Sequence, residues 1–248
     1  MRVLYILWVR QLKRYLRSRS RIAGAIGQPL LFLLALGYGL GSVYKAAGHG
    51  NYLEFLVPGI MAQTILFSAM FYGAMIIFDR QFGFLKETLV APVSRLRIMI
   101  GGALGGATTS VLQGCIVFLL ALALGFRPHD WLLVPVAICF LSAQALAVAT
   151  FSSGIGSVVQ DMQGFQAINQ FLIFPLYFLS GALYPLDHVP TWLHTIAVIN
   201  PISYTVDGLR WALLGTSHFG IGTDSTVLCL TVLAGIAFGA YRFTRIEA

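Results

Sequence analysis

The chain has 248 residues, of which 58% are hydrophobic and 10% charged, and its formal net charge at pH 7 is +7. Soluble domains usually carry about a quarter charged residues, so this composition excludes an ordinary soluble protein. The basic residues lie beside long uncharged runs, not on a stripe with interleaved aromatic rings, and this argues against nucleic-acid binding. A bilayer core about 30 Å thick needs about 20 apolar residues per helix, so the length allows about five to seven spans with short loops.

Residues 1–21 predict a basic amphipathic helix that lies at the membrane surface. Arg10 and Arg14 recur at helical spacing, whereas Leu4 and Trp8 populate another side of the same helix. Such a helix suits an anionic membrane surface. A signal peptide is the alternative, but the short apolar stretch runs directly into basic residues without a small-residue cleavage site, so we do not expect one.

Six apolar runs follow, and each is long enough to cross the bilayer as a helix. We therefore expect an all-α integral membrane protein in which residues 1–248 form a single transmembrane domain. The third and fourth runs exceed one bilayer thickness, so their helices must tilt or extend beyond the membrane. The expected spans are residues 22–44, 55–78, 98–126, 131–160, 162–186 and 225–241.

The stretch between the fifth and sixth spans is too apolar for an ordinary external loop. Asn200 followed by Pro201 resembles a helix N-cap with proline in the first turn, and Gly215 resembles the stop. A helix of this length is too short to cross the bilayer, so we expect re-entrant helices within residues 187–215. The residues that we single out on them are Asn200, Pro201, Tyr204, Asp207 and Arg210.

Asp207 and Arg210 are the charged residues of this expected re-entrant helix. Their i, i+3 spacing places both on one helix face, and we expect them to pair. An unpaired charge near lipid is costly, which gives the pairing a physical reason. Two independent interfacial charges are the alternative.

Lys and Arg are distributed unequally between the two sides of the expected membrane. Thirteen of the 16 lie before the first span, between the second and third spans, or after the last span; the other three are Lys45, Arg127 and Arg210. The positive-inside rule then places both termini and residues 79–97 in the cytoplasm.

Three pairs of glycines lie four residues apart within the expected spans. Small residues at this spacing permit close approach between helices. The approach can serve packing within one subunit or a dimer interface, and the sequence does not separate the two. The pairs are Gly101/Gly105, Gly102/Gly106 and Gly235/Gly239.

Residues that would carry catalysis or ion coupling are missing from the sequence. None of the three lysines follows a glycine, so there is no Walker A phosphate loop, and neither HExxH nor GxSxG occurs. The span centres hold no Asp, Glu, Lys, Arg or His, which argues against a proton- or sodium-coupled carrier and against an intramembrane hydrolase. We therefore expect no catalytic residue, metal site or cofactor on this chain.

Residues 79–97 form the most informative segment. They mix charges with apolar side chains such as Phe84, residues 86–89 can extend a helix, and Pro92 then ends it. A short amphipathic helix joined rigidly to two spans would be a handle for a partner protein. A solvated loop that only orients the chain is an equally good interpretation.

Several short motifs occur in a fixed order relative to the spans. After the basic N-terminal helix, residues 28–29 read QP, 55–59 read FLVPG, 86–95 read KETLVAPVSR and 200–210 read NPISYTVDGLR. Together they resemble the ABC-2 type permeases, the membrane subunits of ABC exporters that include drug-resistance and nodulation-factor exporters. The resemblance covers essentially the whole chain.

This resemblance implies two permease subunits with two separate ABC ATPase subunits in a bacterial inner membrane. ATP and Mg would be bound by the ATPases. The residues that would couple to them are Arg80, Phe84, Lys86, Glu87, Thr88, Leu89, Pro92, Arg95 and Asp161. The substrate would pass between the two permeases along the second and fifth spans.

Aromatic residues on these two spans would line the path for an amphipathic drug, lipid or glycolipid, and ordinary packing is the alternative role for their rings. They are Phe67, Phe71, Tyr72, Phe171, Phe174 and Tyr177. The alternative functions are a polysaccharide or lipo-oligosaccharide export permease and a membrane scaffold that transports nothing.

Overall fold

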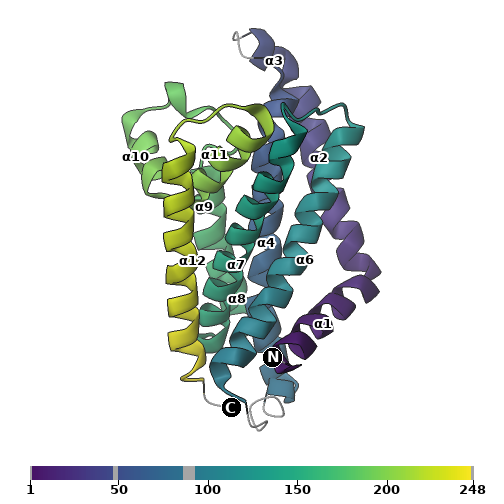
Figure 1. The fold of residues 1–248 in the computed structure, drawn as a ribbon, viewed down its shortest axis with the longest axis vertical. Helices are drawn as coiled ribbons and strands as arrows, with labels where there is room; N and C mark the ends of the chain where they lie inside the picture. The colour runs from purple at the N-terminus through teal and green to yellow at the C-terminus, as the bar shows by residue number, and fades with distance from the viewer. Residues whose placement is uncertain (1, 47–49, 86–92, 247–248) are drawn as a thin grey trace.

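The computed structural model describes residues 2–46, 50–85 and 93–246, and every regular element within these ranges is a helix (Figure 1). Both termini lie at one end of the bundle. The last turn of the helix that ends at Gln81 and the first turn of the helix that begins at Arg95 lie at the same end. We call this the cytoplasmic end, after the orientation expected from the distribution of Lys and Arg. The opposite end is called the outer end.

Among the residues that the structure describes, four helices are long and apolar enough to cross a membrane. They agree with the expected second, third, fourth and sixth spans to within a few residues at each end. A short 3-10 turn, η1 (Trp131–Leu133), precedes the third of them. The four are α4 (Tyr52–Gln81), α6 (Arg95–Ala123), α7 (Val134–Val158) and α12 (Ile221–Phe243).

The helix at the expected fifth span is shorter than residues 162–186, and it is not α-helical throughout. It runs through α8 (Met162–Ile168), a π-helical turn η2 (Asn169–Ile173) and α9 (Phe174–Phe178). Pro175 has no backbone N–H to donate, so a regular α-helix would lack one hydrogen bond at this residue. The wider π-helical turn just before Pro175 avoids this loss. Residues 179–185 form turns, not helix.

The expected first span, residues 22–44, is divided into two helices in the structure. It consists of α2 (Arg19–Gly39) followed by the short α3 (Gly41–Ala46).

The N-terminal helix α1 (Arg2–Arg17) packs against the bundle and is amphipathic, as expected. Leu7 and Tyr15 are buried, and the indole Nε1 of Trp8 donates a hydrogen bond to Thr108 Oγ1 of α6 at 2.9 Å. The helix is interrupted at Ser18, and α1 and α2 therefore meet at an angle beside the bundle (Figure 1).

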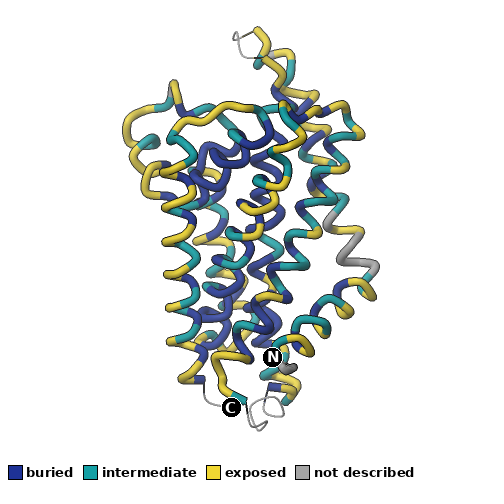
Figure 2. The backbone as a smooth tube through the Cα atoms, in the orientation of Figure 1, coloured by how far each residue is buried: buried dark blue, intermediate teal, exposed yellow. Residues whose placement is uncertain are grey.

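The core is built around α4. In its most apolar 18-residue window, 83% of the residues are buried, whereas the corresponding value for α12 is 17%. Figure 2 shows the same contrast, with buried backbone in the centre and exposed turns along α12. Helices α6 and α7 flank α4, and α12 packs on α7.

The glycine pairs face other helices of the same chain. A Cβ on Gly105 would lie 2.6 Å from Gln11 Cβ on α1, and one on Gly102 would clash with the ring of Tyr72 on α4. A Cβ on Gly235 would lie 2.7 Å from the carbonyl oxygen of Ala147 on α7. These contacts favour packing within one subunit as the reason for the small residues.

Short helices form the outer end (Figure 1). They are η3 (Leu186–His188), α10 (Thr191–Ile199) and α11 (Pro201–Leu214). The bounds of α11 confirm the helix expected from its sequence: Asn200 is the N-cap, Pro201 is the first residue, and Gly215 ends the helix with φ 75°.

Candidate functional site

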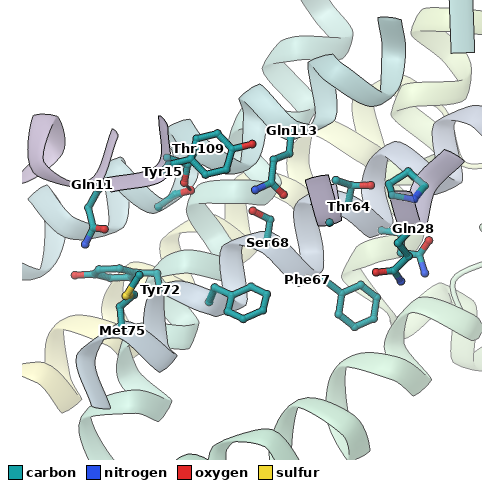
Figure 3. A pocket seen from close by; sticks show the side chains of 15 residues that line it. Gln11, Tyr15, Gln28, Thr64, Phe67, Ser68, Tyr72, Met75, Thr109 and Gln113 are labelled. Carbon is teal, nitrogen blue, oxygen red and sulfur yellow. Dashed lines mark hydrogen bonds between the residues drawn. The ribbon is translucent and has the colours of Figure 1, made fainter. Parts of the chain in front are cut away.

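A cavity of about 330 Å³ lies between α1, α2, α4 and α6. Figure 3 shows that side chains from these four distant segments converge on one space. None of the lining residues is Asp, Glu, Lys, Arg or His, yet most of them are polar. The polar lining residues are Gln11, Tyr15, Gln28, Gln63, Thr64, Ser68, Tyr72, Thr109 and Gln113.

Helix α4 contributes the longest wall of this cavity, from Gln63 to Met75. The lining positions on α4 are adjacent pairs that repeat every four residues, so one helix face carries them all. The distance along α4 between the two ends of this wall is about 18 Å at 1.5 Å per residue. The cavity therefore covers the middle of α4 and reaches toward its cytoplasmic end, and it opens sideways where Gln28 and Phe71 are exposed.

Some polar groups in the cavity wall are bound by the chain itself. Thr64 Oγ1 donates to the Ile60 carbonyl at 2.9 Å, and the hydroxyl groups of Ser68 and Ser110 are 3.0 Å apart. The Tyr72 hydroxyl donates to the Met99 carbonyl at 3.2 Å. These bonds fix the shape of the wall.

Other polar groups of the wall remain available. The side-chain amides of Gln11, Gln28 and Gln63 make no hydrogen bond within the described ranges, although Gln11 and Gln63 are 9% and 4% exposed. An amide offers two N–H donors and one carbonyl acceptor without a net charge. Together with the rings of Phe67 and Phe71, these groups suit a molecule that has both uncharged polar groups and apolar parts.

The six aromatic residues assigned to a transport path do not form one lining. Phe67, Phe71 and Tyr72 line the cavity, and Phe67 contacts the rings of Phe174 and Tyr177 at centroid distances of 4.9 and 6.5 Å. Phe174 and Tyr177 therefore lie behind Phe67, outside the lining. Phe171 is 83% exposed and belongs to a separate surface.

At the cytoplasmic end, α1 is joined to α4 through Asp79. The Asp79 carboxylate lies 3.4 Å from a guanidinium nitrogen of Arg10 and 3.6 Å from one of Arg14. Helix α1 therefore carries two cavity residues, Gln11 and Tyr15, on one side and two arginines that hold the end of α4 on another. In the sequence, Arg10 and Arg14 are four residues apart and share one helix face, and Asp79 is an acidic residue at the end of an apolar span. These two features were the sequence signal for the contact.

The residues assigned to ATPase coupling are only partly within the described ranges. Arg80 donates to the carbonyl oxygens of Ser157 and Val159 at 2.7 and 3.1 Å, which ties α4 to the end of α7. Asp161 caps α8 by accepting a hydrogen bond from the Gly164 N–H at 2.6 Å, and Phe84 is 54% exposed. Lys86, Glu87, Thr88, Leu89 and Pro92 lie outside the described residues.

Arg95, at the start of α6, has a role that the sequence did not indicate. One of its guanidinium nitrogens donates to the carbonyl oxygens of Thr244 and Ile246 at 3.0 and 2.8 Å. Arg95 therefore binds the carbonyl groups just beyond α12 and fixes the C-terminal segment to the bundle.

At the outer end, the expected pair of Asp207 and Arg210 does not form, because each finds other partners. The Asp207 carboxylate accepts hydrogen bonds from the backbone N–H of His218 and of Phe219, and from the hydroxyl of Ser217. The loop after α11 thus supplies donors that the spacing along the helix could not reveal.

Arg210 points to a different segment. It donates to the carbonyl oxygens of Gly181 and Ala182 at 2.8 and 3.3 Å, and its guanidinium lies 3.9 Å from the centroid of the Phe55 ring. It therefore binds α11 to the turn after α9 and to the start of α4.

These features define a multi-helix membrane protein with an uncharged cavity that is lined by both polar and apolar groups and, within the described ranges, no cluster of three or more potential metal ligands. The sequence profile described as ABC-2 type transporter matches residues 2–214. The chain therefore belongs to the ABC-2 type transporter family. It is a transmembrane permease subunit of an ABC transporter, and ATP hydrolysis resides on a partner ATPase.

Named proteins with similar sequences agree with this assignment. The putative transport permease ycf38 of Cyanophora paradoxa is 30% identical over 94% of this chain and 84% of its own length. Nodulation protein J of Rhizobium leguminosarum bv. trifolii is 28% identical over 92% and 85%. The inner membrane transport permease YadH of Escherichia coli K12 is 26% identical over 92% and 89%.

Proposed function

We propose that the chain is the permease of a bacterial inner-membrane exporter that moves an amphipathic molecule out of the cytoplasm or the inner leaflet. The molecule would be a drug, lipid or glycolipid whose polar part is uncharged. The observation that carries this proposal is the cavity, whose free amides and aromatic rings offer hydrogen bonds and apolar contact but no charge. A scaffold subunit would have no need for such an open polar cavity within the membrane.

The proposed topology has six spans, with α2, α4, α6, α7, the α8–α9 segment and α12 each crossing the bilayer. Helices α10 and α11 would enter the outer leaflet and return, because each is too short to cross. Both termini would be cytoplasmic. Two copies of the chain with two ATPase subunits would form the transporter, and the path would run between the copies.

Coupling to the ATPase would use residues 79–97. The ends of α4 and α6 that flank this segment are held by ion pairs with α1 and by hydrogen bonds to α7 and the C-terminal segment. A displacement of the segment would therefore reach α1, whose Gln11 and Tyr15 form part of the cavity wall. This connection supports a mechanical link between ATP hydrolysis and the cavity.

Reconstitution of the chain with its ATPase in proteoliposomes would test the proposal. We expect amphipathic molecules with an uncharged polar part to stimulate ATP hydrolysis and to accumulate on the outer side. A complex whose ATPase activity ignores drugs, lipids and glycolipids alike would favour a scaffold. Failure to copurify with any P-loop ATPase would contradict the assignment of partners.

A further inference from the structure

A second hollow, of about 400 Å³, lies at the cytoplasmic end where α4, α7 and α12 terminate. None of its lining residues lines the polar cavity described above. Its polar side chains are Arg80, Ser157, Gln160, Arg242 and Arg245. Three of these five are arginines, so the hollow is strongly basic.

No acidic side chain of the described residues lies within ion-pair distance of these three arginines. Arg80 uses two nitrogens on backbone carbonyls, and its Nε is buried without a hydrogen-bond partner in the described chain. Arg242 and Arg245 stack on the Tyr241 ring, at 5.7 and 4.2 Å from its centroid. Stacking holds the guanidinium planes and leaves their edges available for an anion.

The wall of the hollow is fixed by other contacts. Arg95 binds the Thr244 and Ile246 carbonyls, and the side chains of Phe243 and Ile246 are 1% and 3% exposed. These contacts fix the C-terminal segment that carries Arg245. The backbone beside the hollow is thus fixed, and the exposed side chains of Arg242 and Arg245 extend from it.

The hollow lies where α12, a helix long and apolar enough to cross the membrane, ends at the cytoplasmic side. Farther along α12, Leu230 and Leu233 are 60% and 62% exposed, so this helix presents an apolar surface to its surroundings. A molecule with a phosphate in the hollow and acyl chains along α12 would satisfy both surfaces. Guanidinium groups bind phosphate oxygens through paired N–H donors.

We propose that this hollow, with Arg80, Arg242 and Arg245 around it, binds the phosphate headgroup of an anionic phospholipid from the cytoplasmic leaflet. Basic pockets between membrane helices on this side are suited to anionic headgroups. The apolar face of α12 distinguishes a lipid from free phosphate or from an acidic segment of a partner protein, because neither of these would use it.

The full chain in nanodiscs would provide the test, with the binding of labelled phosphatidylglycerol measured against a phosphatidylcholine background. Each basic residue near a membrane surface contributes about 1 kcal/mol, so Arg242→Gln and Arg245→Gln should each lower the affinity about fivefold. Both side chains are on the last turn of α12 or beyond it, so their replacement should not disturb the core. Arg97→Gln, an exposed arginine at the same end that does not line the hollow, should leave the affinity unchanged.

Equal binding of phosphatidylglycerol and phosphatidylcholine, or unchanged affinity in both variants, would overturn the proposal. Complete displacement of the lipid by inorganic phosphate would assign the hollow to free phosphate instead. Loss of ATPase copurification in the variants without loss of lipid binding would make the hollow a docking site for protein. None of these results depends on substrate-stimulated ATP hydrolysis, so they leave the proposed function untouched.

Discussion

Two groups of buried polar side chains differ in how their hydrogen-bonding capacity is used. At the outer end, Asn200, Asp207 and Arg210 all bind backbone groups, and Asp207 and Arg210 join α11 to other segments. In the cavity, the amides of Gln11 and Gln63 have no partner within the described ranges. The outer group holds the fold together, whereas the cavity group remains available to a ligand.

This difference has an energetic meaning. The amides of Gln11 and Gln63 face a cavity that is wide enough for water, so water can satisfy them and they contribute little to the stability of the fold. Replacing a member of the outer group should therefore destabilise the protein, and replacing an open amide should impair function alone. The following predictions test this contrast in order of decreasing effect on stability.

Arg210→Met should cause the largest decrease in the free energy of unfolding. It removes two hydrogen bonds and the stacking on Phe55, and it leaves the buried Asp207 charge without a nearby cation. Loss of one member of a buried charged network typically costs about 3–5 kcal/mol. Reversible unfolding in mixed micelles would measure the change.

Arg127→Met is the matched control, because Arg127 is an exposed arginine that binds only backbone carbonyls close to it in sequence. We expect Arg127→Met to change the free energy of unfolding by less than about 0.5 kcal/mol. Equal effects of the two substitutions would show that Arg210 has no special structural role.

Asn200→Ala should have a smaller but clear effect. The Asn200 side chain caps α11 through the Ile202 N–H at 3.0 Å and donates to the Leu176 carbonyl at 2.6 Å. Loss of an N-cap costs about 0.5–2 kcal/mol. The same unfolding measurement applies, and a more stable variant would contradict the assignment of this residue to the structural group.

The double substitution Arg10→Gln and Arg14→Gln should change stability little, because exposed ion pairs contribute about 0–1 kcal/mol. It should nevertheless weaken coupling, because these arginines join α1 to Asp79. The ratio of transported substrate to hydrolysed ATP should fall severalfold in proteoliposomes. Lys13→Gln is the control, because Lys13 is an exposed residue of the same helix that makes no ion pair with a described residue. An equal fall of this ratio in the double variant and in the control would show that the contacts of α1 with Asp79 have no role in coupling.

Gln63→Leu should leave stability unchanged or raise it by up to about 1 kcal/mol, because an open buried amide is replaced by an apolar side chain. Thermal unfolding in detergent would detect the change. Clear destabilisation would mean that Gln63 belongs to the structural group, which would break the contrast between the two regions.

The sequence predicted elements whose cause is local. Asn200, Pro201 and Gly215 defined α11 because capping and helix termination depend on adjacent residues. The apolar runs predicted six spans, and four of them are long apolar helices among the described residues, because only length and hydrophobicity were needed to predict these four. The π-helical turn Asn169–Ile173 was missed, since an apolar run does not reveal where the backbone widens.

Features that depend on contacts between distant segments were less predictable. The pairing of Asp207 with Arg210 was wrong because the loop at 217–219 supplies nearer donors to Asp207. The glutamines of the cavity were not singled out, although Gln63, Thr64 and Ser68 are polar residues on one face of an apolar span. That signal was present in the sequence, but their convergence with Gln11 and Gln28 required the fold.

The most direct test of the central claim is the ATPase activity of the reconstituted transporter with wild-type chain and with Gln63→Leu. We expect an amphipathic molecule with an uncharged polar part to stimulate the wild-type complex. The variant should assemble with the ATPase but lose at least tenfold in apparent affinity for that molecule. Equal stimulation of both complexes at the same substrate concentration would contradict the claim that the cavity is the substrate site.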